Sequence, residues 1–211
     1  MIETQNVTFK YPRSAAPVLS DSSVRFERGE ITAVTGKNGC GKTTLTKLLV
    51  GILRPSAGRV LIDSEDIAGM DLFEIGRLVG YVFQDPGRQL FCDTVFNEVA
   101  YGLRHAGMNE EDVTHITEDH LERFDLARYR GTYPGKLSLG EKQRLILAAV
   151  IALGAGHLVL DEPTTGLDAR RRREFGNLLL DLKQEHGCGI IFVSHEYDFI
   201  ARYADRELVM P

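Results

Sequence analysis

The order of apolar and polar residues along the chain predicts that strands and helices alternate. Val7, Phe9 and Tyr11 alternate with polar neighbours, and this period of two indicates a β-strand. Across residues 41–52 the apolar positions recur with a helical period instead. Residues 71–74 fit a capping box that opens another helix. Further strands are expected at residues 18–26, 30–35, 59–62, 78–83, 157–160, 190–193 and 207–210.

The pattern changes between about residues 84 and 152, where the strand signal disappears. Three helices are expected in this stretch, at residues 94–103, 110–124 and 138–153. Beyond it, helices at 169–185 and 196–203 alternate again with strands. The chain is therefore expected to be a single α/β domain over residues 1–211, with a mostly parallel sheet and a helical insertion at about 84–152.

Composition and charge narrow the possible classes of protein. The 211 residues are 43% hydrophobic, which is enough to bury a full core. Acidic residues number 30 and basic residues 25, so the net charge is −5. This balance argues against a protein that coats nucleic acid, and no nucleic-acid partner is expected. A single phosphate site remains compatible with it, because such a site needs only a few local donors.

Cysteine usage and the uncharged segments bear on localisation. Cys40, Cys92 and Cys188 fit neither a disulfide framework nor a zinc spacing, so a reducing cytosol is expected. The first residues lack the basic and apolar regions of a signal peptide. The longest uncharged stretch, residues 145–160, holds 16 residues, fewer than the ~18 of a membrane span. Any role at a membrane is therefore expected to depend on a partner.

A glycine-rich loop at residues 36–43 carries the clearest chemistry. It fits the pattern G-x-x-x-x-G-K-[ST], follows an apolar strand and opens a helix. Glycines at 36, 39 and 41 permit left-handed backbone conformations, so successive N–H groups can surround an anion. Lys42 is expected to reach the β- and γ-phosphates of a nucleotide, and Thr43 to bind Mg²⁺. The alternative is a glycine-rich turn that contains Lys-Thr by chance, and the strand–loop–helix context disfavours it.

Two further segments fit a nucleotide-hydrolysing site. The apolar strand at 157–160 ends in Asp161, which fits an outer-shell Mg²⁺ ligand. Glu162, the next residue, can polarise an attacking water as a general base. An acidic strand-end turn is the alternative interpretation. Ser138 and Glu141 form a capping box before an apolar run, and a capped helix N-terminus is also an anion site.

Together these segments resemble the ATP-binding cassette (ABC) family, the nucleotide-binding subunits of ABC transporters. Residues 36–44 are similar to its Walker A motif, Gln84 to its Q-loop, and residues 138–141 to its signature. Residues 158–162 are similar to Walker B, 166–168 to the D-loop, and His195 to the switch histidine. The resemblance implies a P-loop NTPase core with an N-terminal antiparallel β-subdomain and an inserted helical subdomain, which binds and hydrolyses ATP with Mg²⁺.

The resemblance also assigns roles to residues. Glu162, His195 and Gln84 are expected to be catalytic, and Thr43, Gln84 and Asp161 to hold the metal. Tyr11 is expected to stack on adenine, although a lone Tyr after a strand is more often a core or surface residue. The nucleotide-binding residues are expected to be Tyr11, Gly36, Asn38, Gly39, Cys40, Gly41, Lys42, Thr43, Thr44, Ser138, Gly140, Glu141 and Asp168.

Residues 83–91 and 94–102 resemble the energy-coupling-factor (ECF) branch in particular. Importers of this branch pair two ATPases with a membrane coupling protein and a small substrate-binding membrane protein, and usually carry vitamins or transition-metal ions. The resemblance therefore implies a second ATPase subunit, identical or paralogous, both membrane partners, and a peripheral place on the cytoplasmic face of the cell membrane. A soluble ABC protein of DNA repair or translation is the alternative, and a P-loop kinase would leave Ser138 and His195 unexplained.

The chain departs from the family pattern in two ways. The signature usually reads Leu-Ser-Gly-Gly-Gln, whereas Leu139 and Glu141 stand here at its third and fifth positions. An added charge at a helix end is worth about 0.3–1 kcal/mol, so the signature is expected to be weakened without being abolished. Many members also continue beyond the final strand, so a dimer-holding or regulatory region is expected to be missing here.

Overall fold

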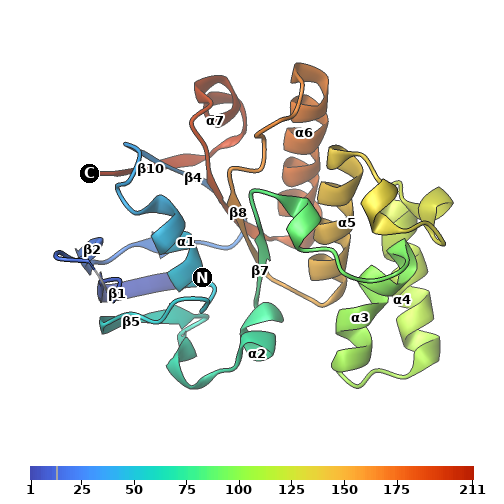
Figure 1. The fold of residues 1–211 in the computed structure, drawn as a ribbon, viewed down its shortest axis with the longest axis horizontal. Coiled ribbons are helices and arrows are strands. Elements are labelled where there is room, and N and C mark those ends of the chain that lie inside the picture. The colour runs from blue at the N-terminus through green and yellow to red at the C-terminus, as the bar shows by residue number, and fades with distance from the viewer. Residues whose placement is uncertain (13) are drawn as a thin grey trace.

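Within residues 1–12 and 14–211, which the computed structural model describes, ten strands form two sheets (Figure 1). The first sheet is antiparallel and is built around β1. The start of β1 pairs with β3, its end pairs with β2, and β5 pairs with it from Ile2 to Thr8. Its strands are β1 (Ile2–Phe9), β2 (Leu19–Ser22), β3 (Arg25–Phe26), β5 (Ala57–Ile62) and β6 (Glu65–Asp66).

The second sheet is parallel and has the order β10-β4-β9-β8-β7. Its strands are β10 (Arg206–Met210), β4 (Ile31–Gly36), β9 (Gly189–Val193), β8 (His157–Asp161) and β7 (Val79–Val82). Because these strands run the same way, their carboxyl ends share one edge of the sheet. Ligands of open α/β sheets bind outside that edge, so the residues that follow β4, β7, β8 and β9 are brought together there.

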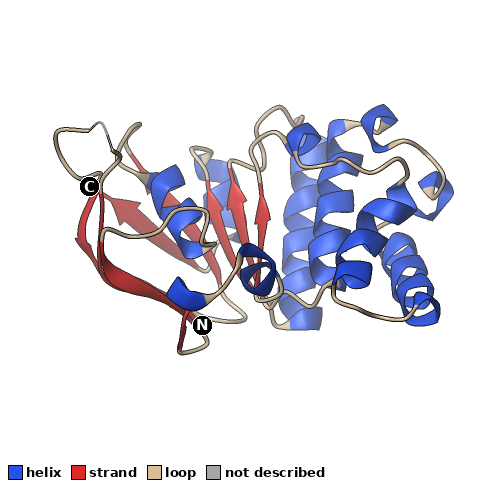
Figure 2. Cartoon of the chain, turned by 60° about the horizontal axis from the view of Figure 1, so that its bottom comes forward, coloured by secondary structure: helices blue, strands red, loops and turns tan. Residues whose placement is uncertain are grey.

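The helices occupy distinct parts of the molecule. Helices α3, α4 and α5 gather at the end away from the antiparallel sheet, as Figure 2 shows. No helix within the described residues is both long and apolar enough to cross a membrane. The helices are α1 (Lys42–Leu49), α2 (Leu72–Gly76), α3 (Val95–His105), α4 (Glu110–Arg123), α5 (Leu139–Ala152), α6 (Ala169–His186) and α7 (Tyr197–Tyr203), with short 3₁₀ turns at Ile67–Gly69, Pro86–Arg88, Ala127–Tyr129 and Pro134–Lys136.

The parallel sheet is buried on both faces, and alternate side chains of each strand belong to different cores. Val34 and Val159 pack with α1 and the antiparallel sheet. Their neighbours Ala33, Leu158 and Leu160 pack with α5 and α6 on the other face. Successive side chains of a strand point to opposite faces, so strands buried on both sides contain continuous apolar runs. This explains why residues 157–160 lack the alternation of residues 7–11.

The structure confirms the expected fold class, but the antiparallel sheet differs in detail: its first strand begins at Ile2, and the short strand β6 was not predicted. Residues 18–26 do not form a single strand but the separate strands β2 and β3. Between them the Val24 N–H donates to the Thr4 side-chain oxygen at 2.9 Å, and the Thr4 N–H donates to the Val24 carbonyl at 2.8 Å. A side chain thus replaces one bond of the ladder. Asp21 also takes a left-handed conformation, with φ of 49°.

Candidate active site

The loop between β4 and α1 has the backbone of an anion site. Gly36, Gly39 and Gly41 have φ of 139°, 84° and 101°, a region that glycine enters without steric cost. A Cβ at Gly36 would lie 2.6 Å from the Met210 carbonyl oxygen, so this position also has no room for a side chain. The loop ends at the N-terminus of α1, where unpaired N–H groups favour an anion.

Lys42 is buried at the base of this loop, with 7% of its surface exposed. Its Nζ donates to the carbonyl oxygens of Gly36 and Lys37, both at 2.9 Å. These partners are neutral, and no carboxylate pairs with Lys42 within the described residues. The ammonium charge therefore remains uncompensated at a place where the backbone already favours an anion.

Oxygen ligands suited to Mg²⁺ meet beside Lys42. Thr43 Oγ1 lies 3.4 Å from Asp161 Oδ1, and Tyr81 donates its hydroxyl to Asp161 Oδ2 at 3.3 Å. Burial raises the pKa of the Asp161 carboxyl, and burial beside Asp161 raises the pKa of Tyr81. A hydroxyl and a carboxylate are hard oxygen donors of the kind that Mg²⁺ takes, so the residues present fit that ion.

Glu162 follows Asp161 and is held by residues from distant segments. Gln84 Nε2 donates to Glu162 Oε2 at 3.1 Å, and His195 Nε2 lies 3.7 Å from Glu162 Oε1. The backbone of Glu162 has φ of 48°, a strained conformation that costs about 1–3 kcal/mol and is concentrated at functional sites. The three residues expected to be catalytic are therefore neighbours, although 111 positions separate Gln84 from His195.

A cavity of about 420 Å³ lies between the loop and two of these residues, Glu162 and His195. Tyr11 stands at its side, with 38% of its surface exposed and its hydroxyl 3.2 Å from Thr44 Oγ1. Cys40 does not line the cavity but packs its side chain against the core beneath the antiparallel sheet. The lining residues are Tyr11, Val18, Asn38, Gly39, Gly41, Lys42, Thr43, Thr44, Glu162 and His195.

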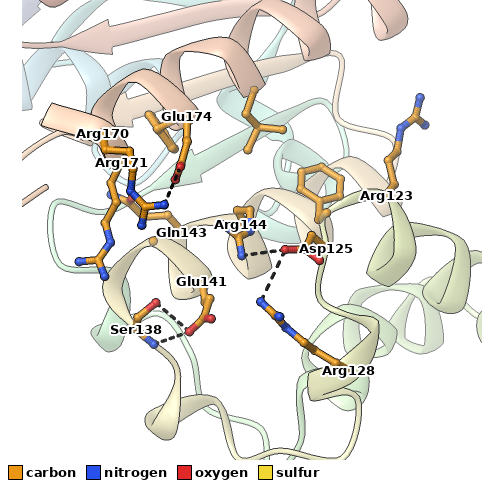
Figure 3. A pocket seen from close by; sticks show the side chains of 14 residues that line it. Arg123, Asp125, Arg128, Ser138, Glu141, Gln143, Arg144, Arg170, Arg171 and Glu174 are labelled. Carbon is orange, nitrogen blue, oxygen red and sulfur yellow. Dashed lines mark hydrogen bonds and ion pairs between the residues drawn. The ribbon is translucent and has the colours of Figure 1, made fainter. Parts of the chain in front are cut away.

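The signature residues line a different cavity, of about 440 Å³, between α4, α5 and α6 (Figure 3). Glu141 accepts from the Ser138 N–H at 2.8 Å, the Ser138 hydroxyl at 2.7 Å and the Tyr129 hydroxyl at 2.6 Å. The Tyr129 hydroxyl, followed by the Ser138 bonds, lowers the pKa of Glu141 to about 2. Ser138, Gly140 and Glu141 thus line a cavity separate from that of the phosphate loop of their own chain. Asp168 caps α6 by accepting from the Arg171 N–H at 2.9 Å.

Tyr81 is the residue at this site that the sequence pattern did not single out. It lies in β7, is 9% exposed, and shares its hydroxyl between Asp161 and Thr46 Oγ1, which is 3.5 Å away. A tyrosine within an apolar strand has the pattern of an ordinary core residue. Its contact with Asp161 comes from the pairing of β7 with β8, which local sequence does not encode.

Comparison with known proteins gives the class. The family model described as ABC transporter matches residues 19–165, more than half of the chain. The chain therefore belongs to the ABC transporter family, as its motifs predicted. It is an ABC ATPase, which binds and hydrolyses ATP.

Individual relatives point toward the ECF branch. The chain is 40% identical to the energy-coupling factor transporter ATP-binding protein EcfA of Methanothermobacter thermautotrophicus, over 100% of this chain and 68% of that protein. Its fold is similar to cbiO1 of Clostridium perfringens, part of the ABC transporter complex cbiONQ, with a TM-score of 0.89, 32% identity and coverage of 99% and 84%. It is also similar to a dimeric ATP-binding cassette in a post-hydrolysis state with ADP and Pi, with a TM-score of 0.85, 25% identity and coverage of 100% and 94%.

Proposed function

We propose that this chain is the ATP-hydrolysing subunit of an ECF-type membrane importer, with a vitamin or a transition-metal ion as cargo. It would work on the cytoplasmic face of the membrane through its partners, namely a second ATPase subunit, a coupling protein and a substrate-binding membrane protein. A separate polypeptide would recognise the cargo. The similarity to EcfA and to cbiO1 supports this proposal.

The main observation behind the proposal is that the expected site residues line two separate cavities. The phosphate loop and Glu162 line one cavity, whereas Ser138 and Gly140 line the other. This division supports an arrangement in which the signature would act on ATP held by the phosphate loop of another subunit. Two ATP molecules bound between two subunits would hold the pair together, and hydrolysis would release it.

Within one such site, the side chains divide the work. Lys42 would bind the β- and γ-phosphates, while Thr43, Asp161 and Gln84 would hold Mg²⁺, which neutralises developing phosphate charge when bound. Glu162 would take the proton of the attacking water. His195, close to Glu162 Oε1, would sense the terminal phosphate. Tyr11 would stack on the adenine at the side of the cavity.

The segment after Gln84 offers a surface for the membrane partner. Phe91 and Tyr101 are 65% and 52% exposed, and their rings meet edge to face with centroids 4.8 Å apart. Buried Glu98 fixes this segment to α3, because its carboxylate accepts the N–H groups of Phe91 at 3.1 Å and Cys92 at 2.8 Å. An exposed aromatic pair on a rigid support is typical of interaction surfaces. We propose that it passes motion from Gln84 to the coupling protein.

Affinity purification from detergent-solubilised membranes tests the proposal. The tagged chain is expected to recover a second ABC subunit and integral membrane proteins in constant proportion, as measured by quantitative mass spectrometry. Phe91→Asp should abolish recovery of the membrane proteins and leave ATP binding unchanged. Val209→Asp, which charges an exposed apolar residue on β10, is the matched control and should recover them normally. Recovery of soluble proteins alone, such as DNA-repair or ribosomal factors, would contradict the importer assignment.

A further inference from the structure

We propose that Arg172 is a positioning residue for His195 and acts through an ion pair with Glu196. The inference rests on the proposed function, in which His195 senses the terminal phosphate of ATP. It adds a physical link between α6, which begins directly after Asp168, and the short segment that carries His195 between β9 and α7.

The ion pair joins two elements that are distant in sequence. Arg172 Nη1 lies 2.5 Å from Glu196 Oε2, and the two side chains are only 38% and 31% exposed. Helices α6 and α7 are neighbours (Figure 1). Arg172 and Glu196 line a cavity of about 220 Å³ together with residues of both helices. Partial burial makes such a pair stronger than a fully exposed one, because water screens it less.

Within the described residues, the Arg172 guanidinium donates to one partner, the Glu196 carboxylate. Its Nε is buried and has no hydrogen-bond partner among residues 1–12 and 14–211. Removal of the Glu196 carboxylate would therefore leave a half-buried guanidinium with its main partner missing, which is costly.

Glu196 transmits this restraint to the histidine through the backbone. Its N–H donates to Ser194 Oγ at 3.1 Å, and its carbonyl accepts the Ile200 N–H of α7 at 3.0 Å. Ser194, on the other side of His195, is 2% exposed. The backbone of His195 is thus held at both ends, while its side chain remains 46% exposed and reaches toward Glu162.

The consequence concerns the distance between His195 and the reacting atoms. A shift of the first turns of α6 moves Arg172, then Glu196, and with it the adjacent peptide of His195. Misplacement of a catalytic group by about 1 Å can cost up to about 10²-fold in rate. The segment around Asp168 and the histidine are therefore coupled within one chain.

Three single variants test this link. Arg172→Met and Glu196→Gln should each lower kcat for ATP by about tenfold and leave KM within about twofold. Lys183→Met is the matched control: Lys183, on the same helix, pairs with Asp205 at 2.9 Å, and Asp205 accepts the N–H of Ile31 at the start of β4, whereas His195 follows the end of β9. This control should lower the melting temperature by as much as Arg172→Met while keeping wild-type kcat. If Arg172→Met and Glu196→Gln both retain kcat within about twofold, the inference is overturned.

A double variant tests whether Arg172 acts on turnover through His195. In His195→Ala, which should itself reduce turnover and spare ADP binding, adding Arg172→Met should cause no further loss. A further tenfold loss there would overturn the inference and assign Arg172 a separate role. Wild-type turnover in His195→Ala alone would instead refute the sensing role in the proposed function. Glu196→Gln keeps the side-chain shape, so it remains informative if Arg172→Met does not fold.

Discussion

In the phosphate-loop cavity a buried cation faces neutral groups, whereas in the signature cavity the charges are already paired. Lys42 contacts only backbone carbonyls among its described polar partners. Around the signature, Arg128 and Arg144 both approach the Asp125 carboxylate at 3.7 Å, and Arg170 approaches Glu174 at 3.4 Å (Figure 3). Glu141 is likewise saturated by its three donors.

The difference indicates how the two cavities would act. An uncompensated charge in a loop of N–H donors attracts an anion without rearrangement, because the site is already organised for it. A cluster of mutually paired groups must first exchange its internal bonds. We therefore expect nucleotide affinity to depend on the loop, and the signature to contribute later, when two subunits close.

The largest effect is expected at Glu162, the proposed general base in the phosphate-loop cavity. Glu162→Gln keeps the shape of the side chain but removes the base, which contributes roughly 10²–10⁴-fold to turnover. ATP should still bind, and a dimer trapped with ATP should elute from size-exclusion chromatography ahead of the monomer. Turnover within about threefold of wild type would contradict the role of Glu162.

A variant of Lys42 tests whether its unpaired positive charge contributes to ATP affinity. Lys42→Ala removes a charge-assisted contact worth about 1.5–3 kcal/mol, so calorimetry should show at least about tenfold weaker ATP binding by the monomer. Arg128→Met removes a paired arginine from the signature cavity and should leave that affinity unchanged. Equal losses in both variants would abolish the contrast between the two cavities.

A smaller effect is expected at Glu141. Glu141→Gln removes a negative charge beside the Ser138 hydroxyl and should raise turnover by less than about fivefold, since a charge at a helix end is worth about 0.3–1 kcal/mol. Its pKa is about 2 in the folded chain, against an ordinary 4.5. The stability that the ionised carboxylate supplies is thus complete above pH 4.5 and lost as the pH falls toward 2. The variant should show a flatter decline of melting temperature over that interval, and an unchanged decline would contradict the saturated state of Glu141.

Cys40 is expected to show the smallest effect. Its side chain packs against the core, and only the loop around it borders the cavity. Cys40→Ser should therefore keep kcat and KM for ATP within about twofold of wild type in a steady-state assay. A loss beyond about fivefold would assign the thiol itself to the nucleotide site.

Local patterns in the sequence predicted most of the helices and strands and the chemistry of single segments. Helix and strand periods, the capping box at Ser138 and the glycine pattern of residues 36–41 act over a few neighbouring residues, so they are readable without a fold. The order of its motifs, from the loop at 36–44 to His195, gave the resemblance to the family, and the match over residues 19–165 confirmed it. The roles assigned to individual site residues remain predictions.

Which side chains come into contact depends on the packing of elements that are far apart in the sequence. Parallel pairing of β7, β8 and β9 brings Gln84, Glu162 and His195 to one edge, because strand ends align only when strand order is set. The same pairing places Tyr81 against Asp161, and a side-chain bond from Thr4 divides residues 18–26 into two strands. The separation of the signature from its own phosphate loop is also a tertiary fact. Each of these depends on contacts between residues far apart in the chain, which no local pattern of side chains specifies.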